Sequence, residues 1–244
     1  MSPAATPTNP AATIGTASAS TTAHRSATER RQDRIMPRAV LIAGITHPLA
    51  WIAGLAVWPT NLDVRSDDAA VLATYSGSSV PAAVQAALVH GLAGVALAVV
   101  TVGLAGLTAV PSARRVVLWS GLGAACTSLV QLAVDLGLAL HVAPSGDAGS
   151  AGATLRIIDH LDGAKMLLLA ALALGTLQAA RRRSVRWLAL ASAALAATIA
   201  VSGIGYLFLV SPLASVAFVS GPLLLVWMPT VAVTVWRAAR HTVA

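Results

Sequence analysis

The sequence predicts an all-α integral membrane protein, a polytopic bundle of about six transmembrane helices. Hydrophobic residues make up 57% of the chain and charged residues only 10%, whereas an ordinary soluble domain carries roughly 25% charged residues. Six apolar runs follow one another, and arginines collect at every second junction between them. Because so few charges cannot cover a globular surface with groups that water solvates, lipid is the natural solvent for this chain.

Residues 1–37 precede the first apolar run and predict a disordered cytoplasmic tail. Ala, Ser, Thr and Pro dominate the first 34 residues, which show no apolar periodicity. Such a segment buries too little hydrophobic area to offset the entropy that is lost when it becomes ordered. We therefore expect a single folded part, the six-helix transmembrane domain of residues 38–238.

The lengths of the apolar runs predict the spans of this domain. A helix rises ~1.5 Å per residue, so roughly 20 residues cross a hydrocarbon core of ~30 Å. The predicted spans are residues 39–58, 84–110, 116–142, 161–180, 187–210 and 213–236. We expect them to pack through Ala, Gly, Ser and Thr, which let helices approach closely. The two outer connections, 59–83 and 143–157, are rich in Gly, Ser, Pro and Asp, which indicates exposed turns.

The fourth span is expected to carry charge into the membrane. Its uncharged part, residues 166–180, is 15 residues long and would cross only ~22 Å. To span the bilayer, this helix has to include residues 161–165. Asp162 and Lys165 are therefore predicted at membrane depth or at its outer edge.

The basic residues predict the orientation of the chain. They lie before the first span and after the second, fourth and sixth, as Arg25, Arg30, Arg31, Arg34, Arg38, Arg114, Arg115, Arg181, Arg182, Arg183, Arg186, Arg237 and Arg240. Since Lys and Arg stay on the cytoplasmic side, we expect a protein of the cell membrane with both ends in the cytoplasm. The formal net charge of +7 is then spread over one membrane face. This favours anionic lipid headgroups as partners and argues against nucleic acid.

Polar side chains inside the predicted spans are candidates for a functional site, because they are costly in a bilayer. Asp135 and Gln131 lie one turn apart on one face of the third span, and His90 lies in the second. With Asp162 and Lys165, they fall in the outer third of the membrane, ~5–12 Å below its boundary. We expect Asp135 to pair with Lys165 in a pocket that faces the outside. His90 and Gln131 are expected beside this pair.

The other polar residues predict no cofactor, no metal site and no catalytic residue. His47, a further candidate in the first span, lies near the midplane, at a different depth from His90, which argues against a haem held by both. The run Asp159, His160 and Asp162 projects its side chains in different directions from one helix, so it makes a poor set of metal ligands. HExxH, GxSxG and phosphate-binding Gly-Lys motifs are absent from the sequence.

The polar residues also have a purely structural interpretation. Polar pairs within membranes often serve only to hold helices together. Lys165 has the alternative of extending its side chain toward the lipid headgroups. His47 lies next to Pro48, where a histidine is more often a hydrogen-bonded packing residue than a functional one.

Three functions of different classes are compatible with these residues. The first is a non-catalytic multi-pass protein that binds membrane lipids, a partner protein or a second copy of itself; the absence of catalytic motifs favours it over an enzyme. The second is a small-solute or proton-coupled transporter that uses Asp135, Lys165 and His90. The third is an intramembrane enzyme acting on a lipid, with Asp135 or His90 as acid or base. An open cavity that narrows toward the cytoplasm would favour transport, and a cavity open sideways to lipid would favour an enzyme or lipid binding. A cluster sealed by packing would favour a structural role.

Overall fold

The structure is a computed structural model that describes residues 27–60, 62–182 and 185–241, and its regular elements there are all helices. Six helices are long and apolar enough to cross a membrane. These candidate spans are Met36–Val57, Ser79–Leu107, Pro111–Ser145, Ala148–Arg181, Arg186–Leu207 and Ser211–Arg240. The predicted fold class is confirmed: the chain is an all-helical membrane protein.

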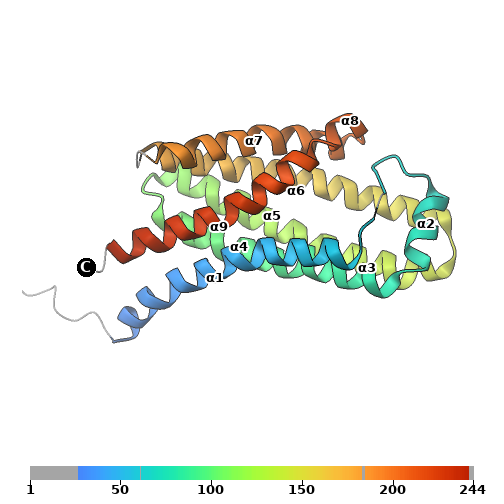
Figure 1. Cartoon of the computed structure of the whole chain (residues 1–244), viewed down its shortest axis with the longest axis horizontal. Coiled ribbons are helices and arrows are strands. Elements are labelled where there is room, and N and C mark those ends of the chain that lie inside the picture. The colour runs from blue at the N-terminus through green and yellow to red at the C-terminus, as the bar shows by residue number, and fades with distance from the viewer. Residues whose placement is uncertain (1–26, 61, 183–184, 242–244) are drawn as a thin grey trace, which may run out of the picture. The chain divides into compact units, whose positions relative to one another are not determined.

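The elements follow one another along the chain as short and long helices (Figure 1). They are α1 (Ala27–Val57), α2 (Asp68–Ser76), α3 (Ser79–Ala86), the π-helical turn η1 (Ala87–Leu92), α4 (Ala93–Leu107), α5 (Pro111–Gly137), the π-helical turn η2 (Leu138–Val142), the 3₁₀ turn η3 (Ala143–Ser145), α6 (Ala148–Arg182), α7 (Arg186–Leu207), α8 (Ser211–Ala214) and α9 (Ala217–His241). The bundle described below is the compact unit that begins at Met36.

The N-terminal tail differs in part from its prediction. Residues 1–26 lie outside the described residues. Residues 27–37, also predicted to be disordered, are helical and form the first turns of α1. This segment contains Glu29, Arg30, Arg31 and Gln32, which are good helix formers. A search for apolar periodicity overlooks a polar helical extension of this kind.

The second outer connection, predicted as a loop over residues 143–157, is mostly helix. The helix α6 begins at Ala148 and continues to Arg182. Asp147 starts it, because its carboxylate accepts hydrogen bonds from the Ser150 hydroxyl at 2.5 Å and from the Ser150 backbone N–H at 3.3 Å. These bonds, led by that of the hydroxyl, hold the pKa of Asp147 below its ordinary value. Ala151 and Ile158 then pack into an apolar core shared with α2, so capping and packing together override a composition typical of turns.

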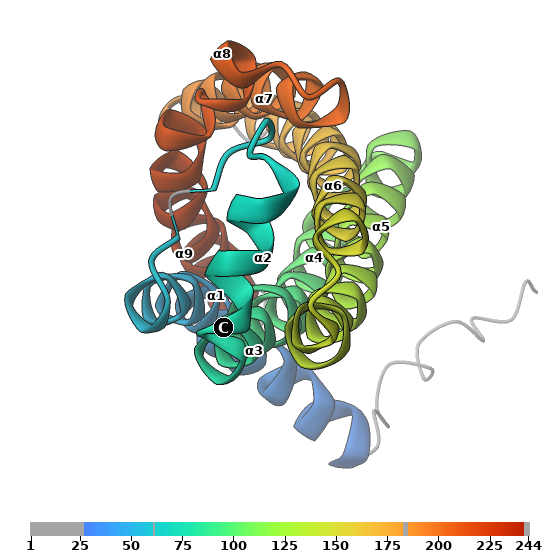
Figure 2. The same cartoon turned by 90° about the vertical axis from the view of Figure 1, so that its right-hand side faces the viewer.

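The first outer connection, predicted as a loop over residues 59–83, contains α2 and the start of α3. The Asp67 side chain caps α2 by accepting a hydrogen bond from the Ala70 backbone N–H at 2.7 Å. Seen from the end, α2 lies across the bundle (Figure 2). Its Tyr75 packs edge to face on Trp58, with the ring centroids 4.8 Å apart. The short helix therefore covers this end of the bundle with an apolar layer.

Small residues bring the long helices together. Gly44 of α1 lies against Ala232 of α9, and Gly163 of α6 lies against the α7 backbone at Gly203 and Leu207. Such contacts are typical of helices that pack in membranes. The main apolar core is made of buried side chains from the long helices, among them Val100, Leu172, Leu195, Trp227 and Met228.

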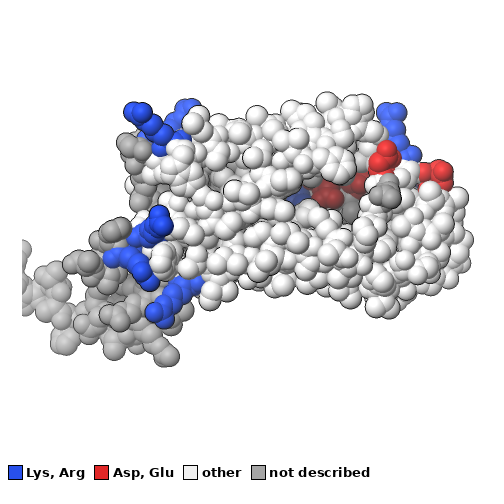
Figure 3. Space-filling view, viewed as in Figure 1, with Lys and Arg blue, Asp and Glu red and all other residues white. Residues whose placement is uncertain are grey.

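Charged side chains gather at the two ends of the bundle (Figure 3). One end, called the arginine end here, carries Arg114, Arg115, Arg181, Arg186, Arg237 and Arg240. The opposite end, called the aspartate end, carries Asp63, Asp67, Asp68 and Asp147 together with Arg65 and Arg156. The alternation of charge along the sequence thus places most arginines at one end and the acidic loops at the other, because successive long helices run in opposite directions.

Candidate functional site

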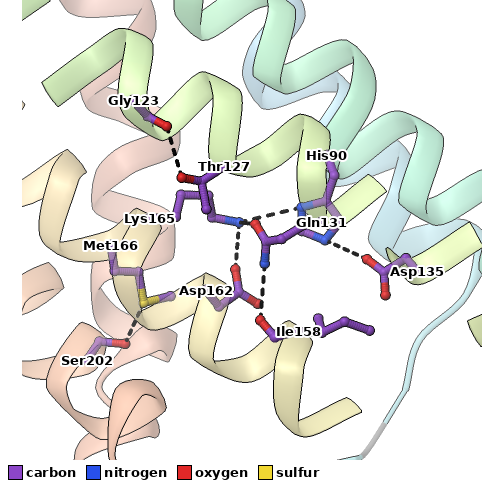
Figure 4. Close-up of polar contacts among 10 residues, drawn as sticks. All are labelled: His90, Gly123, Thr127, Gln131, Asp135, Ile158, Asp162, Lys165, Met166 and Ser202. Carbon is purple, nitrogen blue, oxygen red and sulfur yellow. Dashed lines mark hydrogen bonds and ion pairs between the residues drawn. The ribbon is translucent and has the colours of Figure 1, made fainter. Parts of the chain in front are cut away.

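Lys165, the chain's single lysine, is the centre of a buried polar cluster (Figure 4). Its ammonium Nζ lies 2.5 Å from Asp162 Oδ1 and 2.7 Å from Gln131 Oε1. A third contact, at 3.5 Å, joins Nζ to His90 Nδ1. An ammonium has three N–H donors, so Lys165 uses all of them within the protein. The polar cluster is defined as His90, Gln131, Asp135, Asp162 and Lys165.

The π-helical turn η1 carries His90 into this cluster. A π-helical turn holds an extra residue and is frequent at functional sites. The His90 Nδ1 faces an ammonium, which can only donate, so Nδ1 is an acceptor and Nε2 carries the hydrogen of the neutral ring. That Nε2 lies 3.2 Å from Asp135 Oδ2 and donates to it. Both ring nitrogens are therefore engaged, and His90 joins Asp135 to Lys165.

The expected direct pair of Asp135 and Lys165 is corrected by this geometry. The carboxylate that contacts Lys165 is Asp162, and Asp135 contacts His90 instead. Asp162 and Lys165 are three residues apart on α6, which places them on one helix face. A carboxylate on the same helix reaches the ammonium more readily than one on a neighbouring helix.

Gln131 and His47 differ in how they relate to the cluster. Gln131, fully buried on α5, accepts from Lys165 and donates from Nε2 to the Ile158 carbonyl oxygen at 3.3 Å. His47 stands apart from these contacts, because its Nδ1 lies 3.0 Å from the carbonyl oxygen of Ala93. The structure thus connects five of the six predicted residues by side-chain contacts and ties His47 to α4.

Asp159 and Tyr75 belong beside the cluster, although the sequence did not assign them to it. Asp159 is only 8% exposed, and its Oδ2 has no hydrogen-bond partner. Burial raises the pKa of the Tyr75 hydroxyl, and the nearby charges of Asp135, Asp159 and Asp162 raise it further. The three carboxylates therefore lie near one another and near α2. Asp159 is three residues from Asp162, a spacing that could have placed both on one face; Tyr75 lay in a segment expected to be an exposed loop.

The cluster reaches the surface on the side of the bundle. The side face in Figure 3 is almost free of charge, except for a hollow in which acidic and basic atoms are visible. In the same view, α9 lies above this hollow and α1 lies below it (Figure 1). The charged residues that lie between the two ends in the described chain are Asp135, Asp159, Asp162 and Lys165. The Asp162 side chain keeps 21% of its surface accessible.

The opening arises from the different directions of α1 and α9. These helices touch at Gly44 and Ala232. Closer to the aspartate end, α1 lies instead against η1, where Gly54 contacts Val89. Helix α1 thus packs on a different neighbour there, and the hollow lies between it and α9.

The half of the bundle toward the arginine end combines buried apolar side chains with buried hydroxyl groups, those of Thr101, Ser120, Thr176 and Ser192. Val40, Val117, Leu172 and Val231 are almost fully buried there in the main core. Within the described residues, the long helices carry no Asp, Glu, Lys or Arg between the polar cluster and the arginine end. The polar cluster is therefore open on one side, and toward the arginine end it is closed by packed, uncharged side chains.

Within the described chain, no group of three or more His, Cys, Asp or Glu side chains is arranged to hold a metal ion. In the run Asp159, His160 and Asp162, His160 Nδ1 lies 3.0 Å from the Leu207 carbonyl oxygen, whereas Asp159 is buried.

No protein-family model, curated protein or solved structure matches this chain. Its function is therefore argued from the geometry of the polar cluster.

Proposed function

We propose that this chain is a non-catalytic, multi-pass protein of the cell membrane that binds the headgroup of a lipid at its polar cluster. The observation that carries the proposal is the sideways hollow between α1 and α9, in which charged atoms are visible on an otherwise uncharged face (Figure 3). A lipid in the bilayer can enter such an opening from the side, with its chains left among the exposed apolar side chains of the bundle. Buried charges within a membrane commonly mark a place where a polar group is bound.

Binding is favoured over transport by the closed half of the bundle. A transported solute needs a path to the arginine end, and the interior on that side is filled by the main core, including Val231 and Met228 at 0% exposure. Binding is favoured over catalysis because the two basic groups at the centre of the cluster, the Lys165 ammonium and the His90 ring, already have partners within the protein. Lys165 uses its three donors, and His90 uses both ring nitrogens.

The binding proposal predicts photo-cross-links inside the hollow. The full chain would be reconstituted in vesicles of phosphatidylethanolamine and phosphatidylglycerol, each lipid carrying in turn a diazirine on the first acyl carbons. We expect cross-links at residues 158–165 of α6, mapped by peptide mass spectrometry, in addition to those on lipid-exposed positions. Trp119 and Leu190, exposed by 78% and 73%, serve as internal controls for random lipid contact. Cross-links at the controls but none at 158–165 would show that the cluster takes no lipid.

The proposed orientation places the arginine end in the cytoplasm, because arginines are retained on that side of a membrane. Cys126 is exposed, so it would first be replaced by Ala. Single cysteines would then be introduced as Ser66→Cys and Arg181→Cys. We expect an impermeant maleimide added to intact cells to label position 66 and to reach position 181 only after permeabilisation. The reverse pattern would contradict the orientation.

A further inference from the structure

The polar cluster and Asp159 beside it carry three carboxyl groups and one ammonium group. The carboxyl groups are those of Asp135, Asp159 and Asp162, and the ammonium is that of Lys165, which contacts Asp162 at 2.5 Å. His90 adds no charge, because its ring is neutral in the hydrogen-bond arrangement described above. The donors of Lys165 are all used. An anionic headgroup would therefore meet carboxylates and no free donor of this lysine.

The buried atoms that lack partners are mainly acceptors. Among the described residues, His47 Nε2, Thr101 Oγ1 and Asp159 Oδ2 are buried without a hydrogen-bond partner. Because His47 Nδ1 donates to the carbonyl of Ala93, its Nε2 in the neutral ring can only accept. Asp159 Oδ2 is a carboxylate oxygen beside Asp162. Buried polar groups are normally satisfied. The Asp159 oxygen, which lies beside the polar cluster, therefore calls for a group that brings an N–H or O–H donor, and His47, which lies apart from the cluster, is a separate case.

We propose that the ligand group bound beside Asp159 is a primary ammonium, as carried by the headgroup of an aminophospholipid. This inference rests on the proposed lipid-binding function and adds the chemical class of the headgroup. A primary ammonium offers both of the properties that the cluster lacks, a positive charge and free N–H donors. A trimethylammonium headgroup has the charge but no N–H donor, and a phosphoglycerol headgroup adds negative charge. The site therefore prefers ethanolamine over choline and choline over glycerol headgroups.

The arrangement also explains how a second ammonium is accommodated beside Lys165. Lys165 neutralises Asp162, at 2.5 Å, and donates to two neutral acceptors. Asp159, on the same face of α6, is left with an unpartnered oxygen. The bound ammonium thus pairs with Asp159, and the internal ammonium keeps its own carboxylate. Each cation has a separate partner, so binding does not require the Lys165 contacts to break.

The test measures the binding of defined lipids to the purified full chain in detergent by native mass spectrometry. Phosphatidylethanolamine, phosphatidylcholine and phosphatidylglycerol with identical acyl chains are compared. Propylammonium and tetramethylammonium ions form a soluble arm. The variants are Asp159→Asn, which removes the charge at nearly constant volume, and Asp159→Glu, which keeps the carboxylate. Asp147→Asn is the matched control, because Asp147 lies at the exposed N-terminus of the same helix.

We expect phosphatidylethanolamine to bind about tenfold or more tightly than phosphatidylglycerol, as a charge-assisted hydrogen bond would give. Asp159→Asn should abolish this preference, whereas Asp159→Glu and Asp147→Asn should retain it. Equal affinities for the three lipids in the unmodified chain would overturn the ammonium inference and leave lipid binding intact. Binding of propylammonium that depends on Asp159, without any lipid binding, would support the ammonium inference and overturn the proposed lipid ligand. If Asp159→Asn does not fold, the headgroup preference of the unmodified chain and of Asp159→Glu decides the question.

Discussion

Replacing Lys165 by Met is expected to lower the free energy of unfolding by about 3–5 kcal/mol, the usual cost of removing one partner from a buried ion pair. The change leaves Asp162 without its cation at 2.5 Å and Gln131 without its donor at 2.7 Å. It also frees the Nδ1 acceptor of His90. The melting temperature of the purified protein in detergent should fall by on the order of 10 °C, since a chain of this size loses a few degrees per kcal/mol. Unfolding followed by circular dichroism measures the shift.

Two variants separate the buried charge from the general loss of a basic residue. Asp162→Asn combined with Lys165→Met removes both charges of the pair, so the double variant should be more stable than Lys165→Met alone. Arg156→Met breaks the ion pair between Arg156 and Asp68, whose side chains are 45% and 40% exposed, respectively. Exposed pairs contribute about 0–1 kcal/mol, so this control should melt near the unmodified protein. Equal losses for Lys165→Met and Arg156→Met would contradict the central role of Lys165.

Replacing Gly163 by Ala is the second change with a large expected effect. A Cβ atom at this position would lie 2.5 Å from the Leu207 backbone nitrogen and 2.8 Å from the Gly203 carbonyl oxygen. Both atoms belong to the backbone of α7, so a side-chain rotation cannot relieve the overlap and the helices have to separate. Overpacking of this kind costs typically about 1–3 kcal/mol and occasionally more. We expect a lower melting temperature and a weaker association of α6 with α7.

Gly137→Ala provides the matched control for Gly163→Ala. Gly137 has a helical backbone, with φ −60° and ψ −45°, and a Cβ atom there would meet nothing within 4 Å. Ala is favoured over Gly in a helix by about 1 kcal/mol, so this variant should be as stable as the unmodified chain or more so. The two substitutions are chemically identical and are expected to change stability in opposite directions. A loss of stability in both would show that close contact with α7 is not the cause.

The fold class could be predicted from the sequence because a bilayer imposes simple demands. A span must be apolar and about 20 residues long. The apolar run of residues 187–210 meets both conditions, and the structure has the helix α7, Arg186–Leu207, at this place. The connections could not be predicted in the same way. The segment that starts at Ala148 looks like a turn by composition, and it becomes helical through the Asp147 cap and contacts with α2. Whether such a connection forms a helix depends on its packing against segments that are distant in the sequence, and the periodicity of apolar residues carries no information about that packing.

The structure connects His90, Gln131, Asp135, Asp162 and Lys165 by side-chain contacts and leaves His47 apart, and the contact partners differ from those expected. Depth along a helix follows from counting residues, and it brought His90, Asp135 and Lys165 to one level. Which atoms then meet depends on rotation about each helix axis. The π-helical turn η1 changes that rotation for His90. The sequence of η1, ALVHGL, contains no pattern that predicts a π-helical turn. The free oxygen of Asp159 is likewise a property of the assembled bundle.

The turn η1 has a consequence for how this protein tolerates insertions and deletions. A π-helical turn is in effect an α-helix with one surplus residue, and deletion of a residue from it would restore regular winding. Each residue of an α-helix accounts for about 100° of rotation, so restored winding would turn α3 relative to α4 by that angle. Gln85, which donates to the Trp58 carbonyl from one side of η1, and His90 could then no longer both keep their partners. The register of this one hydrophobic segment is therefore fixed at both ends, and its length is as much a part of the site as the side chains are.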